Sequence, residues 1–558
     1  MQISLNKILV LFVIPLFVYL LPLPFMPLME PDEGRYSMIS HEMNLTGDYV
    51  TPRLKGVVYF EKPPLAYWAT ALSFKAFGEN AFSSRLFAAL TAWGLIILAY
   101  RMGLFFRGAR AGLYSAAVLT TFLYHAALGR INILDMPLGF FVGAAIWAGF
   151  RFFTGEERRK YRLYLLYLFS ALAFLTKGLI GIVFPFGVLA VWLLVSGRLR
   201  DVFSLISPVG ILLFAGISFP WLVLVQRANP DFFRFFFIQE HFLRYTTKIH
   251  DHYEPFYYYL PIVLAGTFPW SAWLPWAIRG TKGGEPLFKK GDVSFLLSWV
   301  VLILAFFSLS SSKLVPYLTP LFAPLAVYMG VIFSRFDERP GNASIRPSSG
   351  YFLAGIAPSL LFLAAMFVPL FLTKHRVNPE IWLCLIAVPV LLQLLLILLP
   401  FRLSARRRGG WFLTIYLLYA LFFASLTAPM AHFLAPYKSA RQLSAAIENY
   451  IPKDAEVYQY GISLYGVDFY TGRKTPVVDD IGELRYGMMQ LPAEERAHYF
   501  LYSDGFFSMA KKRGGIYCAT ETDEKLARLK KEFPEARILW QNAEYSLLQL
   551  HGSTAKEK

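Results

Sequence analysis

Long, nearly uncharged apolar stretches recur along this chain, and they limit its fold more than any other feature. We count about 13 of them, each of roughly 20 residues, the length of a helix that crosses a bilayer. Hydrophobic residues make up 56% of the 558 residues and charged residues only 16%. The sequence therefore predicts a polytopic α-helical membrane protein. The expected spans lie near residues 8–28, 82–105, 111–128, 135–153, 161–176, 179–197, 203–225, 256–277, 293–310, 315–334, 351–373, 381–401 and 411–433.

The charges between the spans predict how the chain is oriented. The Lys and Arg residues behind the net charge of +17 cluster in short turns that alternate with turns of low charge. Basic turns face the cytoplasm, so an odd number of spans leaves the N-terminus inside and the C-terminus outside. This distribution fits anionic lipid headgroups or a phosphorylated substrate better than nucleic acid, which we do not expect as a partner.

Two polar regions are expected on the outer side. A long first outer loop, residues 30–81, contains a periodic stretch from Arg35 to Leu45 that predicts an amphipathic interfacial helix, and Pro63-Pro64 predicts the start of a second one. We expect residues 1–435 to form the transmembrane domain and residues 436–558 a soluble α/β domain. In the latter, the pattern predicts helices at Ser439–Tyr450 and Glu521–Phe533 and strands at Ala455–Gly461, Val467–Tyr470 and Tyr499–Tyr502.

Acidic residues at the membrane edge are the leading catalytic candidates. Asp32 and Glu33 follow the first span directly, and Asp135 stands at the outer start of the fourth. Each could simply cap a helix. Ionisable groups beside the hydrocarbon are costly, however, and usually serve function. Asp32 is our first candidate for a catalytic carboxylate, and Asp135 could orient a donor or hold a cation.

Cationic residues on the same side are candidates to bind a phosphate. Lys62 precedes a predicted helix start, where the dipole favours anions. Arg244 lies three residues after His241, on the same helical face, and its planar fork suits phosphate. Lys177 falls between two spans that carry little other charge, and the hydroxyl of Tyr317 could donate a hydrogen bond. Each of these residues has a simpler explanation by itself: a snorkelling pair, an aromatic belt, a tight turn or an interface anchor. None of these explains why all of them are expected on the same side of the membrane.

The sequence specifies no metal or nucleotide site. Cys384 and Cys518 have no neighbours at metal-ligand spacing, which excludes a cysteine metal site. Glu61 and His241 are ligand types for a divalent metal, but their spacing leaves that alternative open. The chain lacks a glycine-rich phosphate loop, so a nucleotide is not expected.

Taken together, these motifs resemble the C-type glycosyltransferases that use polyprenyl-phosphate sugars. They are most similar to the bacterial undecaprenyl-phosphate aminoarabinose transferases, which modify lipid A. The resemblance covers the membrane part well, whereas the polar tail resembles the family only in its general character. It is carried by Asp32-Glu33-Gly34-Arg35-Tyr36, Gly47-Asp48 with Pro52-Arg53-Leu54, Tyr59-Phe60-Glu61-Lys62-Pro63, Asp135-Met136-Pro137, Thr176-Lys177-Gly178, Glu240-His241 with Arg244, and Ser312-Lys313-Leu314 with Tyr317.

The resemblance implies a reaction and roles for these residues. The expected enzyme moves 4-amino-4-deoxy-L-arabinose from undecaprenyl phosphate to a phosphate of lipid A in the bacterial inner membrane, which confers resistance to polymyxin. Its site and its C-terminal domain would face the periplasm, among membrane lipids. The family pattern implies Asp32 as the essential carboxylate and Asp135 as a second acid near the sugar. Further candidates are Glu33, Glu61 and His241, and the carrier phosphate would be held by Tyr36, Lys62, Lys177, Arg244 and Tyr317.

Other functions stay open at the level of the sequence. A polyprenyl-phosphate-dependent transferase of another sugar, such as mannose or galacturonic acid, to protein or lipid would share the Asp-Glu motif. A lipid-sugar transporter is a different class, but its charges usually lie near the bilayer midplane rather than at one edge. A catalytically inactive sensor on the same fold is the third alternative.

Overall fold

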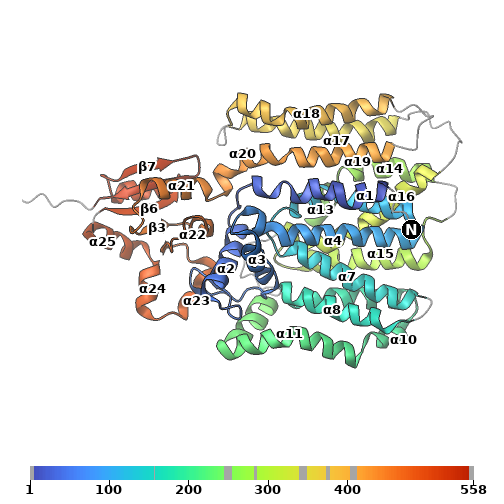
Figure 1. Cartoon of the computed structure of the whole chain (residues 1–558), viewed down its shortest axis with the longest axis horizontal. Coiled ribbons are helices and arrows are strands. Elements are labelled where there is room, and N and C mark those ends of the chain that lie inside the picture. Colours follow the sequence, from blue (N-terminus) through green and yellow to red (C-terminus); the bar gives the residue numbers. More distant parts are fainter. Residues whose placement is uncertain are drawn as a thin grey trace, which may run out of the picture.

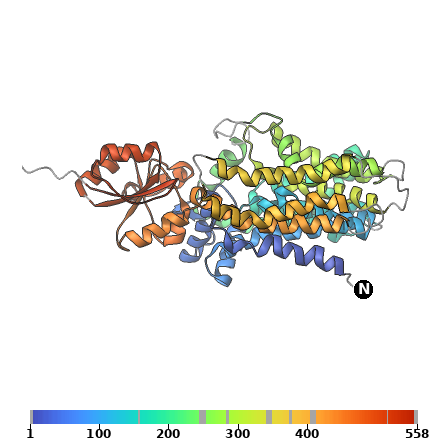
Figure 2. The ribbon, with the colours of Figure 1, turned by 90° about the horizontal axis from the view of Figure 1, so that it is seen from above.

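The apolar stretches of the chain form long helices that lie side by side in a bundle (Figure 1, Figure 2). The computed structural model describes residues 5–155, 158–243, 254–281, 286–338, 349–372, 377–402, 411–513 and 515–551. Within these residues, seven helices are long and apolar enough to cross a membrane: Ala81–Arg107, Asp135–Thr154, Pro208–Ala228, Lys290–Leu309, Val315–Phe336, Pro379–Leu398 and Phe412–Lys438. The chain is thus a polytopic α-helical membrane protein, as predicted.

The remaining expected spans coincide with helical segments that are shorter or interrupted. The first runs from α1 (Leu5–Ile8) through π-helical turns to Leu20. In the part of the chain that the structure describes, the α-helices of the bundle after α1 are α4 (Ala81–Arg107), α5 (Ala109–Thr120), α6 (Leu123–Leu128), α7 (Asp135–Thr154), α8 (Lys160–Lys177), α9 (Ile180–Val195), α10 (Leu199–Val202), α11 (Pro208–Ala228), α13 (Tyr259–Gly266), α14 (Trp270–Thr281), α15 (Lys290–Leu309), α16 (Phe322–Glu338), α17 (Ser349–Phe367), α18 (Pro379–Arg402), α19 (Trp411–Ser425) and α20 (Thr427–Lys438).

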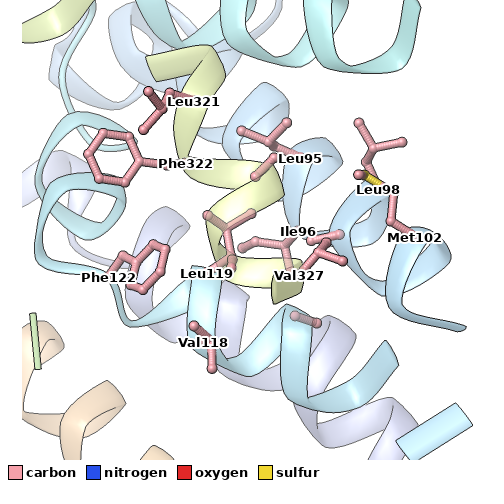
Figure 3. Packing of buried hydrophobic residues seen from close by; sticks show 14 of the residues in the cluster. Leu95, Ile96, Leu98, Met102, Val118, Leu119, Phe122, Leu321, Phe322 and Val327 are labelled. Carbon is pink, nitrogen blue, oxygen red and sulfur yellow. The ribbon is translucent and has the colours of Figure 1, made fainter. Parts of the chain in front are cut away.

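The interior of the bundle is packed with aliphatic and aromatic side chains. Figure 3 shows residues of α4, α5 and α16, among them Leu95, Leu119 and Val327, meeting in one cluster. The helices approach closely where a residue is small. A Cβ atom on Gly330 of α16 would lie 2.4 Å from the backbone nitrogen of Ser115 on α5. Small residues at such crossings bring helix backbones together and increase the packing contacts that hold membrane bundles.

The first loop, residues 30–80, lies at one end of the bundle. It contains α2 (Asp32–Thr46), the antiparallel strands β1 (Arg53–Leu54) and β2 (Val57–Val58), and α3 (Leu65–Phe77). Both predicted helices are present. The helix α2 packs against α3 and against α22 (Tyr465–Thr471) of the C-terminal region. Its buried residues therefore include charged and polar side chains as well as apolar ones.

A buried ion pair ties this loop to the bundle. The Arg85 guanidinium, at the start of α4, donates to both carboxylate oxygens of Glu33 at 2.7 and 2.6 Å. Its remaining N–H groups donate to the carbonyls of Leu23, Met26 and Pro27, so every donor of the fork is satisfied. Both side chains are 1% exposed.

Beyond α20 the chain forms a six-stranded mixed sheet at the same end of the bundle (Figure 1). Its strand order is β5-β4-β3-β6-β8-β7. The strands β5, β4, β3 and β6 are parallel to one another, whereas β8 runs antiparallel to both of its neighbours, β6 and β7. The strands are β3 (Val457–Tyr460), β4 (Val477–Val478), β5 (Phe500–Leu501), β6 (Ile516–Glu521), β7 (Arg537–Gln541) and β8 (Tyr545–Leu550). We call residues 441–551 the sheet region.

The helices of the sheet region cover its sheet and reach the first loop. They are α21 (Arg441–Tyr450), α22, the 3₁₀ turn η8 (Gly482–Leu484), α23 (Arg485–Met489), α24 (Ala493–Tyr499), α25 (Ser503–Arg513) and α26 (Glu524–Glu532). The strand predicted at Val467–Tyr470 is wrong, because these residues belong to α22. Its aromatic and β-branched residues suit a strand locally, but burial of Val467 and Phe469 between two packed layers favours the helix.

Arg85→Met should strongly destabilise the protein. The substitution keeps most of the side chain but leaves the Glu33 carboxylate buried without its cation, which typically costs about 3–5 kcal/mol. Arg101→Met, on the exposed face of the same helix, is the matched control and should melt like the wild type. Thermal unfolding in detergent measures both, and equal melting temperatures for Arg85→Met and wild type would refute the role of this pair.

Candidate functional site

Buried polar contacts hold the sheet region against the first loop. Lys55 Nζ, in the turn between β1 and β2, lies 2.7 Å from the carboxylate of Asp468 on α22 and also donates to Thr475. The Lys55 and Asp468 side chains are 3% and 0% exposed. An ion pair this enclosed is costly to break from one side, so the loop and the sheet region are held in one arrangement.

A second polar contact lies where α2 meets α22. The backbone N–H of Gly466 donates to Glu30 Oε1 at 2.6 Å. A Cβ atom on Gly34 or Gly466 would fall within 2.5 Å of this carboxylate, so both glycines are needed for the carboxyl to fit. Burial raises the pKa of Glu30 to about 8, although the Gly466 N–H and the Arg35 charge oppose the shift. Glu30 therefore belongs to the junction and is not a rim charge.

Asp32, the first catalytic candidate, stands at the N-terminus of α2 with its side chain 52% exposed. The Arg35 guanidinium links it to the sheet region: one terminal nitrogen donates to Asp32 at 3.2 Å, and Nε lies 3.0 Å from the Glu483 carboxylate on η8. Tyr59 also donates to Glu483, at 3.3 Å. The exposed carboxylate is thus bordered by groups from both regions.

The second acid lies in a cationic setting. Lys177, at the end of α8, donates to Asp135 at 2.5 Å, and its ammonium sits 4.8 Å from the centre of the Tyr317 ring. Three predicted residues from three separate segments therefore meet. The pair is about 10% exposed, which leaves an ammonium and a carboxylate at the edge of the bundle.

A third group joins the first loop to the segment after α11. Lys62 Nζ lies 3.7 Å from Glu240, in the π-helical stretch Arg234–Leu243, and 3.9 Å from its neighbour Glu61. The Lys62 ammonium thus faces one acid of the first loop and one of the segment after α11. Arg244 and the side chain of His241 lie outside the described residues.

These groups share one end of the bundle. Asn132, three residues before Asp135, donates its backbone N–H to Glu33, next to Asp32, at 2.7 Å. On the Lys62 side, Phe60 packs in one cluster with Phe174 near the end of α8 and with Trp221 of α11. The segments that carry Asp32, Lys62, Asp135 and Lys177 are therefore in mutual contact.

Glu33 differs from the other predicted candidates because it is enclosed. Besides Arg85, it accepts the backbone N–H groups of Met29 and Asn132. With its side chain 1% exposed, it has no free face for a substrate. Its position supports a structural role at the junction of the first helix, α2 and α4.

Sequence reasoning missed several polar residues of this site. Arg35 and Tyr59 were part of the quoted motifs, but no pattern gave them a role. Glu483 lies in the polar tail, where no local signal distinguishes it from other acids. Tyr67 on α3 is fully buried, and its hydroxyl has no hydrogen-bond partner among the described residues. The closeness of Glu483 to Arg35 depends on a contact between residues about 450 positions apart, which only the fold produces.

The electrostatics of the cluster keep its hydroxyls protonated. Burial, then the charge of Asp32, raises the pKa of Tyr36 well above 10. Partial burial, then the charge of Glu61, raises the pKa of Glu483 to about 7, against the opposing effect of Arg35. Tyr36 is thus a neutral hydrogen-bond donor at neutral pH, whereas Glu483 gains or loses its charge there. Among the residues that the structure describes, no group of three or more His, Cys, Asp or Glu side chains could hold a metal ion.

Comparisons of the chain with known proteins agree with one another. A family model described as dolichyl-phosphate-mannose-protein mannosyltransferase matches residues 61–223. The chain is 30% identical over 515 residues to undecaprenyl phosphate-alpha-4-amino-4-deoxy-L-arabinose arabinosyl transferase 2 of Pseudomonas fluorescens, covering 89% of this chain and 85% of that protein. The protein of the same name, without the number, in Aeromonas hydrophila is 37% identical over 320 residues, but the match spans only 57% of its length and 56% of this chain.

Solved structures extend the similarity to the whole fold. The crystal structure of ArnT from Cupriavidus metallidurans bound to undecaprenyl phosphate superposes with a TM-score of 0.80 at 24% identity, covering 98% of both chains. The apo structure of the same protein gives 0.81 at 23% identity. The bundle and the sheet region therefore form a known combined architecture.

The stability of the junction should fall as the pH rises. Because the pKa of Glu30 rises from 4.5 to about 8 on folding, the protonated carboxyl is the form that fits the junction. Its stabilising effect is complete below pH 4.5, decreases as the pH rises and is lost by about pH 8. Glu30→Gln mimics the protonated form and should flatten the pH dependence of the melting temperature. Glu494→Gln, on an exposed helix of the sheet region, should follow the wild-type curve. Parallel curves for Glu30→Gln and wild type would contradict this assignment.

Proposed function

Because the chain belongs to the family of the undecaprenyl phosphate-alpha-4-amino-4-deoxy-L-arabinose arabinosyl transferases, we propose that it transfers 4-amino-4-deoxy-L-arabinose from undecaprenyl phosphate to a phosphate of lipid A. One observation carries the proposal beyond the family. The Lys177 ammonium lies between Asp135 and the ring of Tyr317, at the bundle end that also bears Asp32. Carboxylates for a sugar and a cation for a phosphate thus occur together.

The proposed donor site divides into two parts. Asp32 and Asp135 face the sugar, and Tyr36, Lys62, Lys177, Arg244 and Tyr317 hold the carrier phosphate. The cations among them stabilise the phosphate as it departs, because fixed positive charge favours a developing anion in a site shielded from water. Asp135 keeps Lys177 oriented until a phosphate takes its place. Glu61 and His241 border this part of the site, beside Lys62 and Arg244.

The transfer needs one bond to form and one to break. An oxygen of the acceptor phosphate attacks the anomeric carbon, while the bond from that carbon to the carrier phosphate breaks and releases undecaprenyl phosphate. The acceptor is already anionic near neutral pH, because the second pKa of a phosphate monoester is about 6. Asp32 therefore acts by stabilising positive charge at the anomeric carbon and by orienting the sugar.

We place the reaction at the periplasmic face of the inner membrane. An odd number of spans, about 13, leaves the N-terminus in the cytoplasm. Seven helices of the described residues have the length and composition to cross a membrane. The first loop and the domain of residues 436–558 then lie in the periplasm. The basic turns of the sequence support this orientation. The lipid A acceptor reaches the site from the outer leaflet.

Asp32→Asn should abolish transfer while leaving the protein folded in detergent. The amide keeps the shape of the side chain but removes the charge that faces the anomeric carbon. The assay is mass spectrometry of lipid A from cells that carry each variant in place of the wild type. Glu79→Gln, which alters an acid of the same loop paired with His41, should preserve modification. Wild-type modification by Asp32→Asn would rule out the assigned role.

Lys62→Ala and Arg244→Ala should each weaken binding of undecaprenyl phosphate about tenfold or more, the usual effect of losing a hydrogen bond to a charged group. Binding to the purified protein can be followed by the quenching of tryptophan fluorescence. Lys75→Ala, on α3 with its ammonium over Tyr49, serves as the control for loss of a lysine. Unchanged affinity in both variants would refute the phosphate assignment.

A further inference from the structure

The hydroxyl of Tyr67 is a buried polar group with no partner in the described part of the chain. The side chain is fully buried on α3 (Leu65–Phe77), within the core that the first loop shares with the sheet region. Leaving a buried hydroxyl unpaired costs about 1–3 kcal/mol. A phenylalanine would fill the same space without that cost, so the hydroxyl calls for an explanation outside packing.

Charged groups from three neighbouring segments act on this hydroxyl. The groups within electrostatic reach are Asp32 and Arg35 on α2, Glu61 after β2, and Glu483 on η8. Tyr36, on α2, packs its ring 5.8 Å from that of Tyr67. Burial, then the charge of Glu61, raises the pKa of Tyr67 well above 10. The group is therefore a neutral hydroxyl, which can donate one hydrogen bond and accept others.

A second unpaired donor lies beside it. Arg35 Nε is buried and, although 3.0 Å from the Glu483 carboxylate, has no hydrogen bond of good geometry there. Two polar groups without proper hydrogen bonds thus border the same carboxylates. Buried polar groups are nearly always paired, so their joint occurrence points to a polar ligand.

The charges around Tyr67 indicate which part of the lipid-linked sugar donor binds there. Three carboxylates, Asp32, Glu61 and Glu483, outnumber the Arg35 cation around Tyr67 and repel a phosphate. Of the phosphate candidates, Lys177 and Tyr317 are grouped around Asp135, while Lys62, 3.9 Å from Glu61, and Tyr36, against the Tyr67 ring, border this acidic group. A hydroxyl or protonated amine of a sugar fits this setting, because it can donate to carboxylates and to the Tyr67 oxygen together.

We propose that Tyr67 is a sugar-binding residue that hydrogen-bonds the amino-pentose of the donor beside Asp32. This inference rests on the proposed function and assigns one wall of its sugar site. Entry of the sugar requires the Glu483 side chain, which is 37% exposed at the border of the sheet region, to move from Arg35. The sugar then takes up the free hydrogen-bonding capacity of Arg35 Nε and the Tyr67 hydroxyl.

Tyr67→Phe tests this inference because it removes only the hydroxyl. The full-length protein in detergent is assayed with undecaprenyl phosphate-linked aminoarabinose and lipid A. We expect kcat/KM to fall about tenfold or more, as for a site that loses a hydrogen bond to its substrate. The melting temperature should stay equal to that of the wild type or rise, because the hydroxyl bonds to none of the residues that the structure describes. A kcat/KM within twofold of the wild-type value would overturn the proposal.

Two further measurements separate the alternatives. Inhibition by undecaprenyl phosphate, which lacks the sugar, should be unchanged in Tyr67→Phe; an equal loss of inhibition would assign the hydroxyl to the phosphate and overturn the proposal. Tyr458→Phe is the matched control, since its hydroxyl donates to Glu456 in the sheet region. It should lower the melting temperature without changing kcat/KM. If the wild type itself transfers no aminoarabinose, the proposed function fails, and binding of the sugar-linked donor to wild type and Tyr67→Phe still tests Tyr67.

Discussion

The buried pair of Glu33 and Arg85 is the contact on which the arrangement of the site depends. It joins the end of the first helical segment, α2 and α4, and its carboxylate also accepts the N–H of Asn132 before α7. Because Asp32 and Glu33 are adjacent, the enclosed carboxylate fixes the exposed one. An acid that stabilises the junction thus stands beside an acid that can meet a substrate. The Asp-Glu motif combines two roles that the sequence alone does not distinguish.

The sheet region is part of the site rather than an appendage. Lys55 and Asp468 hold it to the first loop, and Gly34 and Gly466 allow α2 and α22 to approach around the Glu30 carboxyl. This docking brings Glu483 to Arg35, one side chain away from Asp32. Groups from both ends of the chain therefore control the charge around the exposed carboxylate. Detaching the sheet region would alter that charge as well as the stability of the loop.

Some candidates could be predicted from the sequence because a membrane constrains them strongly. Lys177 and Asp135 are ionisable residues at the ends of apolar stretches, and they pair in the structure. Lys62 could be singled out by its place before two prolines, at the start of α3. In contrast, Val467–Tyr470 was predicted as a strand, because its local preference is outweighed by packing between two layers. The burial of Glu33 against Arg85 is invisible in the sequence, which shows this acid only as the neighbour of Asp32.

The sequence by itself determined the helical membrane architecture and the two helices of the first loop, as well as most of the charged residues assigned to the donor site. It could do so because hydrocarbon tolerates few charges, so length, apolarity and the position of each charge carry most of the information. The tertiary structure alone decided which acids are buried and which are exposed, and that Glu483 reaches Arg35. It also decided that the Tyr67 hydroxyl finds no hydrogen-bond partner among the described residues. These features depend on contacts between distant segments, and no local pattern encodes the fold that creates them.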